Sequence, residues 1–143
     1  MIEVYGELWD FADEPGFVVC ITTNGTIKKN GECVMGRGCA AEAKARFSWL
    51  PKVIGTHIVK NGNIPLYIPD LRILTFPVKH NWYEQADLDL IKDSARRLYE
   101  IASHSTLEYI LPRPGCGNGR LTWSEVKPIL QDLPDNVRVI SRG

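Results

Sequence analysis

The sequence has no excess of charge and no long apolar run. Its 17 basic residues balance 17 acidic ones, so the chain as a whole does not attract nucleic acid or an anionic membrane, and any bound anion must be held by a local site. No segment approaches the roughly 18 apolar residues of a membrane helix. The opening segment MIEVYGELWD has neither the basic stretch nor the apolar core of a signal peptide. We therefore expect a cytoplasmic protein.

Metal-binding and disulfide patterns are also missing. The four cysteines are Cys20, Cys33, Cys39 and Cys116. They form no C-x-x-C pair and have none of the cysteine–histidine spacings that zinc sites use. We predict reduced structural thiols, no metal site and no cofactor. For Cys116, which lies in a glycine-rich stretch, a reactive thiol and a small residue tolerated in a crowded loop are both open interpretations.

The composition is that of a folded domain. Hydrophobic residues make up 44% and charged residues 24% of the 143 residues, which is ordinary for a globular protein with a sizeable core. The length fits one domain. We therefore predict a single domain over residues 1–143.

Strand-like and helix-like segments alternate along the chain. The predicted strands cover residues 2–9, 16–23, 71–78, 107–112 and 136–141, and residues 52–68 are predicted as a strand, an Asn-Gly-Asn turn and a returning strand. Helices are predicted over residues 38–50, stopped by Pro51, and over 87–103. A T-x-x-E capping box at Thr122 and Glu125 begins a last helix, which Pro128 is expected to bend. This order predicts an α/β fold in which helices cover both faces of a mixed sheet.

Two glycine-rich stretches precede predicted helices. NGECVMGRGCA (residues 30–40) comes before the first helix, and PGCGNGR (residues 114–120) lies between a strand and the capped helix. Glycine lets a phosphate approach the backbone closely, and helix N-termini favour anions. Each stretch alone is also consistent with a plain turn, but two such loops suit two linked phosphates.

Taken together, these motifs resemble those of the macrodomains, the ADP-ribose-binding fold. VYGELWD resembles the first strand and GD motif of that family, and VVCITTNG resembles the strand that ends in its asparagine. VMGRGCAAEAKARF and PGCGNGRLTWSEVKPIL resemble its two phosphate loops and their helices. The resemblance implies a macrodomain-like three-layer α/β/α sandwich with a central mixed sheet. It also implies a monomer whose partner is ADP-ribose or an ADP-ribosylated substrate, ADP-ribosylated DNA included, and not a membrane.

The resemblance further implies which residues hold ADP-ribose. Glu7 would meet the adenine amino group, and Asn24 would bind the distal ribose. The whole implied set is Glu7, Leu8, Asn24, Val34, Met35, Gly36, Gly38, Pro114, Gly115, Cys116, Gly117, Asn118, Gly119 and Arg120. By residue chemistry alone, Asn24 before a glycine is equally a turn residue, and Glu7 a surface carboxylate. The Arg37 and Arg120 side chains are expected either beside the diphosphate or in solvent.

FPVKHNWYEQADLDLIKDSARRL (residues 76–98) is similar to one macrodomain branch, which contains DNA ADP-ribosyl glycohydrolase antitoxins and the terminal ADP-ribose protein glycohydrolase. A lysine is catalytic in that branch, and Lys79 stands at its position. Residue chemistry alone also allows a solvated lysine at a strand end. Two positions depart from the pattern: Gly119 replaces the catalytic aspartate of the protein-directed enzyme, and Tyr83 replaces an arginine.

The resemblance therefore implies a hydrolase that uses Lys79 to remove ADP-ribose from a nucleobase in DNA or from a protein side chain. Near an anomeric carbon, an amine attacks the opened sugar or, as an ammonium, stabilises the leaving group. Two alternatives stay open: a phosphatase of ADP-ribose 1''-phosphate and a non-catalytic ADP-ribose reader. Trp82, Tyr83 and Trp123 either stack on a nucleobase or pack against the fold, and His80 has no assigned role.

Overall fold

Six strands form one mixed sheet in the order β1-β6-β5-β2-β4-β3. The computed structural model describes residues 1–143. The strands are β1 (Ile2–Tyr5), β2 (Phe17–Asn24), β3 (Tyr67–Ile68), β4 (Ile73–Lys79), β5 (Glu108–Pro112) and β6 (Val137–Ser141). Every neighbouring pair is parallel except β3 and β4, which are antiparallel.

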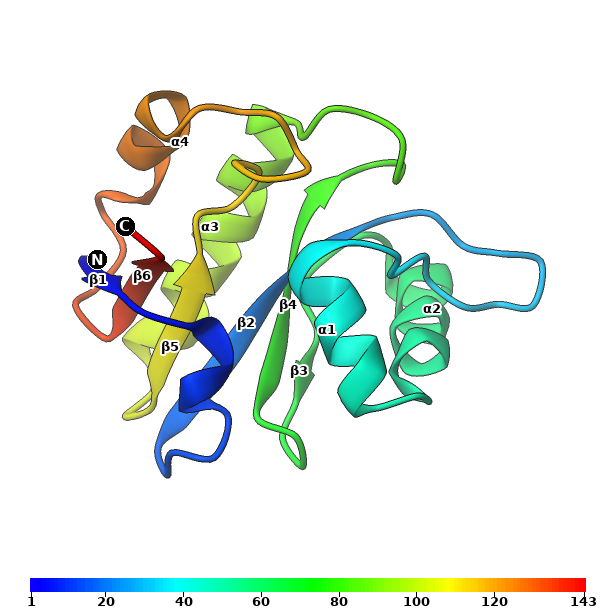
Figure 1. Ribbon diagram of the computed structural model, residues 1–143, viewed down its shortest axis with the longest axis horizontal. Coiled ribbons are helices and arrows are strands. Elements are labelled where there is room, and N and C mark those ends of the chain that lie inside the picture. The colour runs from blue at the N-terminus through cyan, green and yellow to red at the C-terminus, as the bar shows by residue number, and fades with distance from the viewer.

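Helices cover both faces of this sheet (Figure 1). They are the 3₁₀ helix η1 (Leu8–Phe11) and the α-helices α1 (Gly38–Arg46), α2 (Leu50–Asn61), α3 (Leu88–Ser103) and α4 (Trp123–Leu130). Residues of η1, α1 and α2 pack in one apolar cluster, whereas those of α3 and α4 pack in another. The predicted three-layer α/β/α architecture is confirmed. None of the helices combines the length and the apolar character needed to span a bilayer.

Strand β2 separates the two apolar clusters. Val18 and Cys20 point to the cluster under α3 and α4, and Val19 and Ile21 point to the cluster under α1 and α2. All four side chains are buried. Because successive strand residues face opposite sides of the sheet, a strand buried on both faces is a continuous apolar run. This is why residues 16–23 were recognisable as a central strand.

The prediction for residues 52–68 is wrong over most of its length. Residues 50–61 form helix α2, and only the end of the predicted returning strand pairs with β4, as β3. The β-branched residues of this stretch favour a strand locally. Leu50, Ile54 and Ile58 nevertheless lie at helical spacing and pack against the same cluster, so tertiary packing decides for a helix. Pro51 begins this helix instead of only stopping the previous one, because proline fits the first helical turn.

Two other predicted elements are shorter than expected. Strand β1 ends at Tyr5, and Gly6 at φ 147° turns the chain into η1. Helix α1 ends at Arg46, before the predicted end at residue 50. The capping box at Thr122 and Glu125 is confirmed at the start of α4.

The carboxyl ends of the parallel strands define one edge of the sheet. Strands β2 and β5 are neighbours, but the chain leaves them in opposite directions along the sheet. From β2 it continues to β4 on one side, and from β5 it continues to β6 on the other. The helices that follow these two strands lie on opposite faces. Open α/β sheets bind ligands in the crevice at such a reversal of strand order.

Helix α2 packs directly on the backbone of the first glycine-rich loop. A Cβ atom at Gly55 would lie 2.0 Å from the carbonyl oxygen of Gly31. We expect Gly55→Ala to lower the free energy of unfolding by about 1–3 kcal/mol through overpacking, measured by urea denaturation. Val59 on the same helix is 73% exposed, and the control Val59→Ala should change it by less than about 0.5 kcal/mol. A Gly55→Ala variant as stable as the control would contradict this contact.

Candidate functional site

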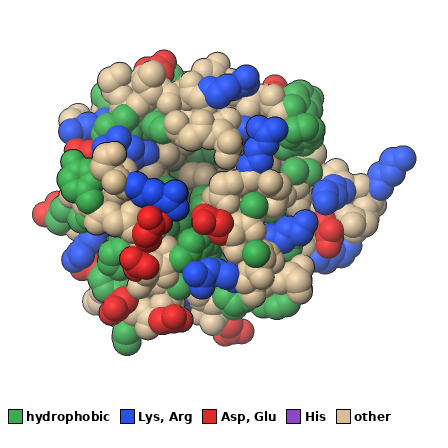
Figure 2. Space-filling model, viewed as in Figure 1, with side chains coloured by type: hydrophobic (Ala, Val, Ile, Leu, Met, Phe, Trp, Pro, Cys, Tyr) green, Lys and Arg blue, Asp and Glu red, His purple; other side chains and the backbone are tan.

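A cavity of about 400 Å³ opens at the carboxyl edge of the sheet. Its lining comes from the carboxyl ends of β2, β4, β5 and β6, from the segments that follow these strands and β1, and from the first half of α1. Figure 2 shows the hollow on the face in view, with basic and acidic side chains around it. The cavity therefore lies at the strand reversal between β2 and β5.

Most of the predicted site residues line this cavity. They are Glu7, Leu8, Asn24, Val34, Met35, Gly36, Gly38, Lys79, Gly115, Gly117, Asn118 and Gly119. Pro114, Cys116 and Arg120 do not line it. Burial raises the pKa of the Cys116 thiol, which disfavours the reactive thiolate form. The interpretation of Cys116 as a small residue in a crowded loop is therefore favoured.

The first glycine-rich loop delivers unbonded backbone amides to the cavity. Helix α1 begins at Gly38, and the first amides of a helix have no acceptor within it. None of the loop hydrogen bonds uses the amides of Gly38, Cys39 or Ala40 either. The Cys39 Sγ lies 3.3 Å from both the amide nitrogen and the Oγ1 of Thr22, which fastens this turn to β2. The contact with Thr22 thus fixes the start of α1, while the backbone N–H groups of its first residues have no acceptor in the protein.

Asn24 shapes the entry to this loop. Its Oδ1 accepts from the Thr26 amide at 3.0 Å, and its Nδ2 donates to the Val34 carbonyl at 3.0 Å. Asn24 is therefore the turn residue that its glycine neighbour suggested, and it also lines the cavity. One N–H and one acceptor lone pair of its amide remain for a ligand.

The second glycine-rich loop offers a matching set of amides. The amides of Cys116, Arg120 and Leu121 donate to carbonyls within the loop, whereas those of Gly117, Asn118 and Gly119 have no protein acceptor. The two loops meet, because a Cβ at Gly38 would lie 3.2 Å from the Asn118 Nδ2. Successive free amides in such loops form anion-binding concavities, and here two of them adjoin.

Close packing explains why position 119 is a glycine. A Cβ at Gly119 would lie 2.5 Å from the carbonyl oxygen of Gly115 and 2.8 Å from the Ala86 Cβ. The Gly119 carbonyl also accepts from the Ala86 amide at 3.0 Å. An aspartate therefore does not fit at this position, and the loop has no place for a carboxylate there.

Lys79 lies at the end of β4, beside the second loop. Its Nζ donates to the carbonyls of Trp82 and Asn118, each at 3.2 Å. No carboxylate forms an ion pair with it. Burial, followed by the nearby cations Arg120 and Arg37, lowers the pKa of Lys79 below its usual value. The cavity therefore has an ammonium without a counter-ion at this end.

The opposite end of the cavity carries a carboxylate and an indole. The Glu7 Oε2 accepts from the Nε and NH2 atoms of Arg142 at 2.9 and 2.8 Å, which leaves Oε1 without a partner. The Trp9 ring also lines the cavity, and the Arg46 guanidinium lies 4.5 Å from its centre. Sequence reasoning missed Trp9 and Arg142. No local motif marks Arg142, because it meets Glu7 only through the pairing of β1 with β6.

The cavity is locally basic. Its charged lining consists of Arg37, Lys79, Arg113 and Arg142 against Glu7 and Glu42. A protein of zero net charge thus has a local excess of positive charge beside free amides. No group of three or more His, Cys, Asp or Glu side chains forms a metal-binding cluster.

The other aromatic candidates, Trp82, Tyr83 and Trp123, lie in three different surroundings. Trp82 lines the cavity, whereas Tyr83 is 64% exposed and does not. Trp123 packs at the edge of the core, donates to the Glu3 Oε1 at 3.0 Å and lies under the Arg113 guanidinium. The packing interpretation of Trp123 is therefore confirmed.

Solved structures of macrodomains match this arrangement. The macrodomain of Mycobacterium tuberculosis DarG matches with a TM-score of 0.75 and 23% identity over 97% of this chain and 96% of that one. The macrodomain of Thermus aquaticus DarG matches with a TM-score of 0.72 and 24% identity over 97% and 95%. Thermosipho africanus DarTG in complex with ADP-ribose matches with a TM-score of 0.74 and 20% identity over 97% of this chain.

These likenesses show that the chain has the macrodomain fold. The chain spans 41% of the Thermosipho DarTG chain. A scan against protein-family models and a search of curated proteins find no match.

The packing at Gly119 and the open space at Gly117 generate a paired prediction. Gly119→Ala should lower the free energy of unfolding by about 1–3 kcal/mol, because its Cβ meets backbone. Gly117→Ala should change it by less than about 0.5 kcal/mol, since no atom lies within 4 Å of its Cβ position. Urea denaturation of the two variants measures the difference. Equal stabilities would show that the second loop has another conformation.

Proposed function

We propose that this protein binds ADP-ribose and removes it from a modified macromolecule, with Lys79 as the catalytic group. The observation that carries the proposal is the uncompensated Lys79 ammonium at one end of a cavity whose middle offers two adjoining sets of free amides. The fold that the chain shares with Thermosipho DarTG, a structure in complex with ADP-ribose, supports this ligand.

ADP-ribose has the charge distribution that this cavity suits. Its two phosphates lie between an adenosine and a second ribose, and Glu7, the loops with the free amides and Lys79 all line the cavity. In the proposed complex, the amides of residues 38–40 and 117–119 hold the diphosphate. The Glu7 Oε1 accepts from the adenine amino group, and the unused N–H and lone pair of Asn24 bind the distal ribose. In the proposed complex, the anomeric carbon then lies beside Lys79.

Hydrolysis at that carbon exchanges one bond. Water forms a bond to the anomeric carbon, and the bond from that carbon to the acceptor atom breaks. The electron pair passes to the acceptor, where the Lys79 ammonium stabilises the charge and donates a proton. The proton released by the water then restores the ammonium. Because Nζ is already oriented as a donor by two carbonyls, we favour this role over nucleophilic attack.

One observation favours a second function, a non-catalytic ADP-ribose reader. Gly119 admits no side chain, so no carboxylate stands beside Lys79 to activate water. The acidic side chains of the cavity are Glu7, which precedes η1, and Glu42, which lies on α1; neither belongs to the strand that carries Lys79. Binding of ADP-ribose without release from any substrate would establish the reader.

The diphosphate site has a direct binding test. Cβ atoms at Gly36 and Gly117 meet no protein atom within 4 Å, so a valine there fills cavity space without disturbing the core. We expect Gly36→Val and Gly117→Val each to weaken ADP-ribose binding at least about tenfold, or roughly 1.4 kcal/mol, by calorimetric titration. Val59→Ala is the control, and unchanged melting temperatures verify folding. Unchanged affinity in both valine variants would exclude the phosphate-loop assignment.

The role of Lys79 is tested by turnover. The assay measures product release from ADP-ribosylated DNA, ADP-ribosylated protein and ADP-ribose 1''-phosphate. Lys79→Ala should lower kcat at least about 100-fold and leave ADP-ribose affinity within about threefold. The pKa of Lys79 is lowered, so the ammonium loses its proton at a pH below the usual lysine pKa of about 10.4. Wild-type kcat should therefore begin to fall, as the pH rises, before that value is reached.

Lys79→Arg distinguishes the two forms of catalysis. Arginine keeps a charged donor but is not a nucleophile at these pH values. Residual activity without the alkaline decline therefore supports the ammonium role, whereas a variant as inactive as Lys79→Ala supports nucleophilic attack. Loss of ADP-ribose binding in Lys79→Ala would instead show that the lysine has only a structural role, in which it joins the loops of Trp82 and Asn118.

A further inference from the structure

Strand β4 contains a β-bulge directly before Lys79. The strands β2 and β4 pair in register through Thr23 and Pro77, but the next pair joins Asn24 to Lys79, so Val78 is an extra residue. A bulge bends the strand and re-aims the side chains next to it. Here Val78 remains buried under α3, and Lys79 lines the cavity. The direction of Lys79 therefore depends on the backbone of the bulge.

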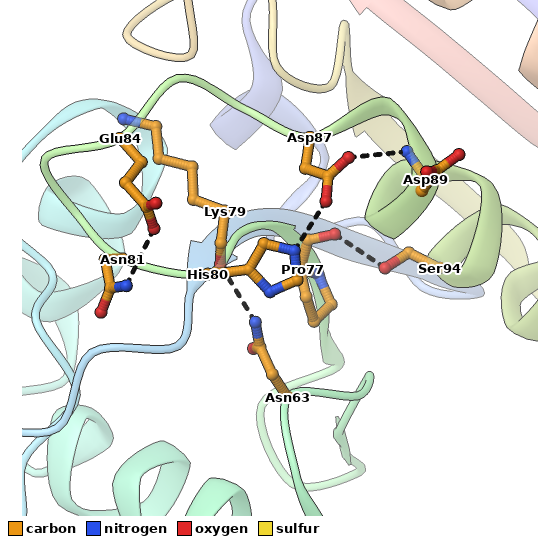
Figure 3. Close-up of polar contacts among 9 residues, drawn as sticks. All are labelled: Asn63, Pro77, Lys79, His80, Asn81, Glu84, Asp87, Asp89 and Ser94. Atoms are coloured by element: carbon orange, nitrogen blue, oxygen red, sulfur yellow. Dashed lines mark hydrogen bonds and ion pairs between the residues drawn. The ribbon is translucent and has the colours of Figure 1, made fainter.

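Four successive carbonyls at this bulge are each anchored by a different partner. The Ser94 Oγ donates to the Pro77 carbonyl at 2.7 Å, and the Asp87 amide donates to the Val78 carbonyl at 2.9 Å. The Asn63 Nδ2 donates to the Lys79 carbonyl at 3.0 Å, and the Gly25 amide donates to the His80 carbonyl at 3.2 Å. Figure 3 shows Asn63 and Ser94 reaching the strand end from separate elements, and the Lys79 side chain extending away from Asn63. Asn63 is thus the one side chain that anchors the carbonyl of Lys79.

The surroundings of Asn63 leave it little freedom. It follows the end of α2, and a Cβ at Gly25 would lie 2.9 Å from its Nδ2. Its Oδ1 is buried without a hydrogen-bond partner. Burial of an unpaired amide oxygen costs stability, so stability alone does not account for an asparagine here. The hydrogen bond from the Asn63 Nδ2 to the Lys79 carbonyl explains why this position is an asparagine.

The amine end of Lys79 has no comparable anchor within the sheet. Its two acceptors, the carbonyls of Trp82 and Asn118, belong to the loops on either side of the cavity. No carboxylate holds the ammonium, and its charged neighbours Arg37 and Arg120 are both cations. The position of Nζ is therefore set by these two carbonyls together with the backbone of residue 79, from which the side chain extends.

We infer that Asn63 is a positioning residue that holds the bulge of β4 and so aims the Lys79 ammonium into the cavity. The inference rests on the proposed function of Lys79 for its effect on turnover. Asn63 does not line the cavity and acts only through Lys79.

The experiment replaces Asn63 and follows the Lys79 amine in the full chain. Asn63→Leu keeps the approximate volume and removes the donor, and Asn63→Ala serves if the leucine variant fails to fold. Asn61→Leu is the matched control, because Asn61 is an exposed asparagine of the same segment whose side chain contacts His57 instead. Acylation of Lys79 by acetic anhydride, measured by mass spectrometry from neutral to alkaline pH, reports its apparent pKa without ligand or turnover.

We expect Asn63→Leu to raise the apparent pKa of Lys79 by about half a unit or more, because the freed amine becomes better solvated. In the release assay, kcat should fall at least about tenfold while KM and ADP-ribose affinity stay within about twofold. Asn61→Leu should match the wild type in both measurements.

Unchanged acylation of Lys79 in the Asn63 variants would overturn the inference. So would a lowered melting temperature with normal Lys79 titration, since Asn63 would then be only structural. If the wild type releases no ADP-ribose from any substrate, the proposed hydrolase function fails, and the acylation result still decides whether Asn63 positions Lys79.

Discussion

Parallel pairing of β2 with both β4 and β5 is the constraint on which the rest of the site depends. Strand β2 is buried on both faces, so its register and direction are strongly specified. With β2 in place, the carboxyl ends of its neighbours meet at one edge, and the loops that leave them turn to opposite faces. The cavity is the space between those loops, which is why residues from four strand ends and from the segments after them line it.

The glycines of the two loops and of helix α2 have two different physical roles. At Gly55 and Gly119, a Cβ would collide with backbone, so these residues allow the loops to pack. At Gly36 and Gly117, a Cβ would meet open space, so packing does not explain them. Open glycines beside unbonded amides are what the close approach of an anion requires. The distinction separates the loop framework from the surface proposed to contact a ligand.

Charge in this protein is arranged locally. Basic and acidic residues balance over the chain, yet the cavity is lined by more basic than acidic side chains, and Lys79 lacks a carboxylate partner. The tight second loop excludes an acidic side chain at Gly119. The same packing that holds the free amides in place therefore also leaves the ammonium uncompensated, and the chemistry proposed for the site follows from the electrostatics of the cation alone.

The sequence by itself determined the α/β class, most strands, the two glycine-rich loops and Lys79, because each has a local signature in periodicity, turn residues or motif. Residues 52–60 were predicted as a strand but belong to helix α2, since β-branched composition is a local preference that burial of Leu50 and Ile54 overrides. Nothing in the sequence marked Trp9 or Arg142 as lining a cavity, or marked Asn63, part of the predicted Asn-Gly-Asn turn, as a contact of Lys79. Only the tertiary structure decided their places, because the pairing of β1 with β6 and the bulge between β2 and β4 are formed by segments far apart in the chain.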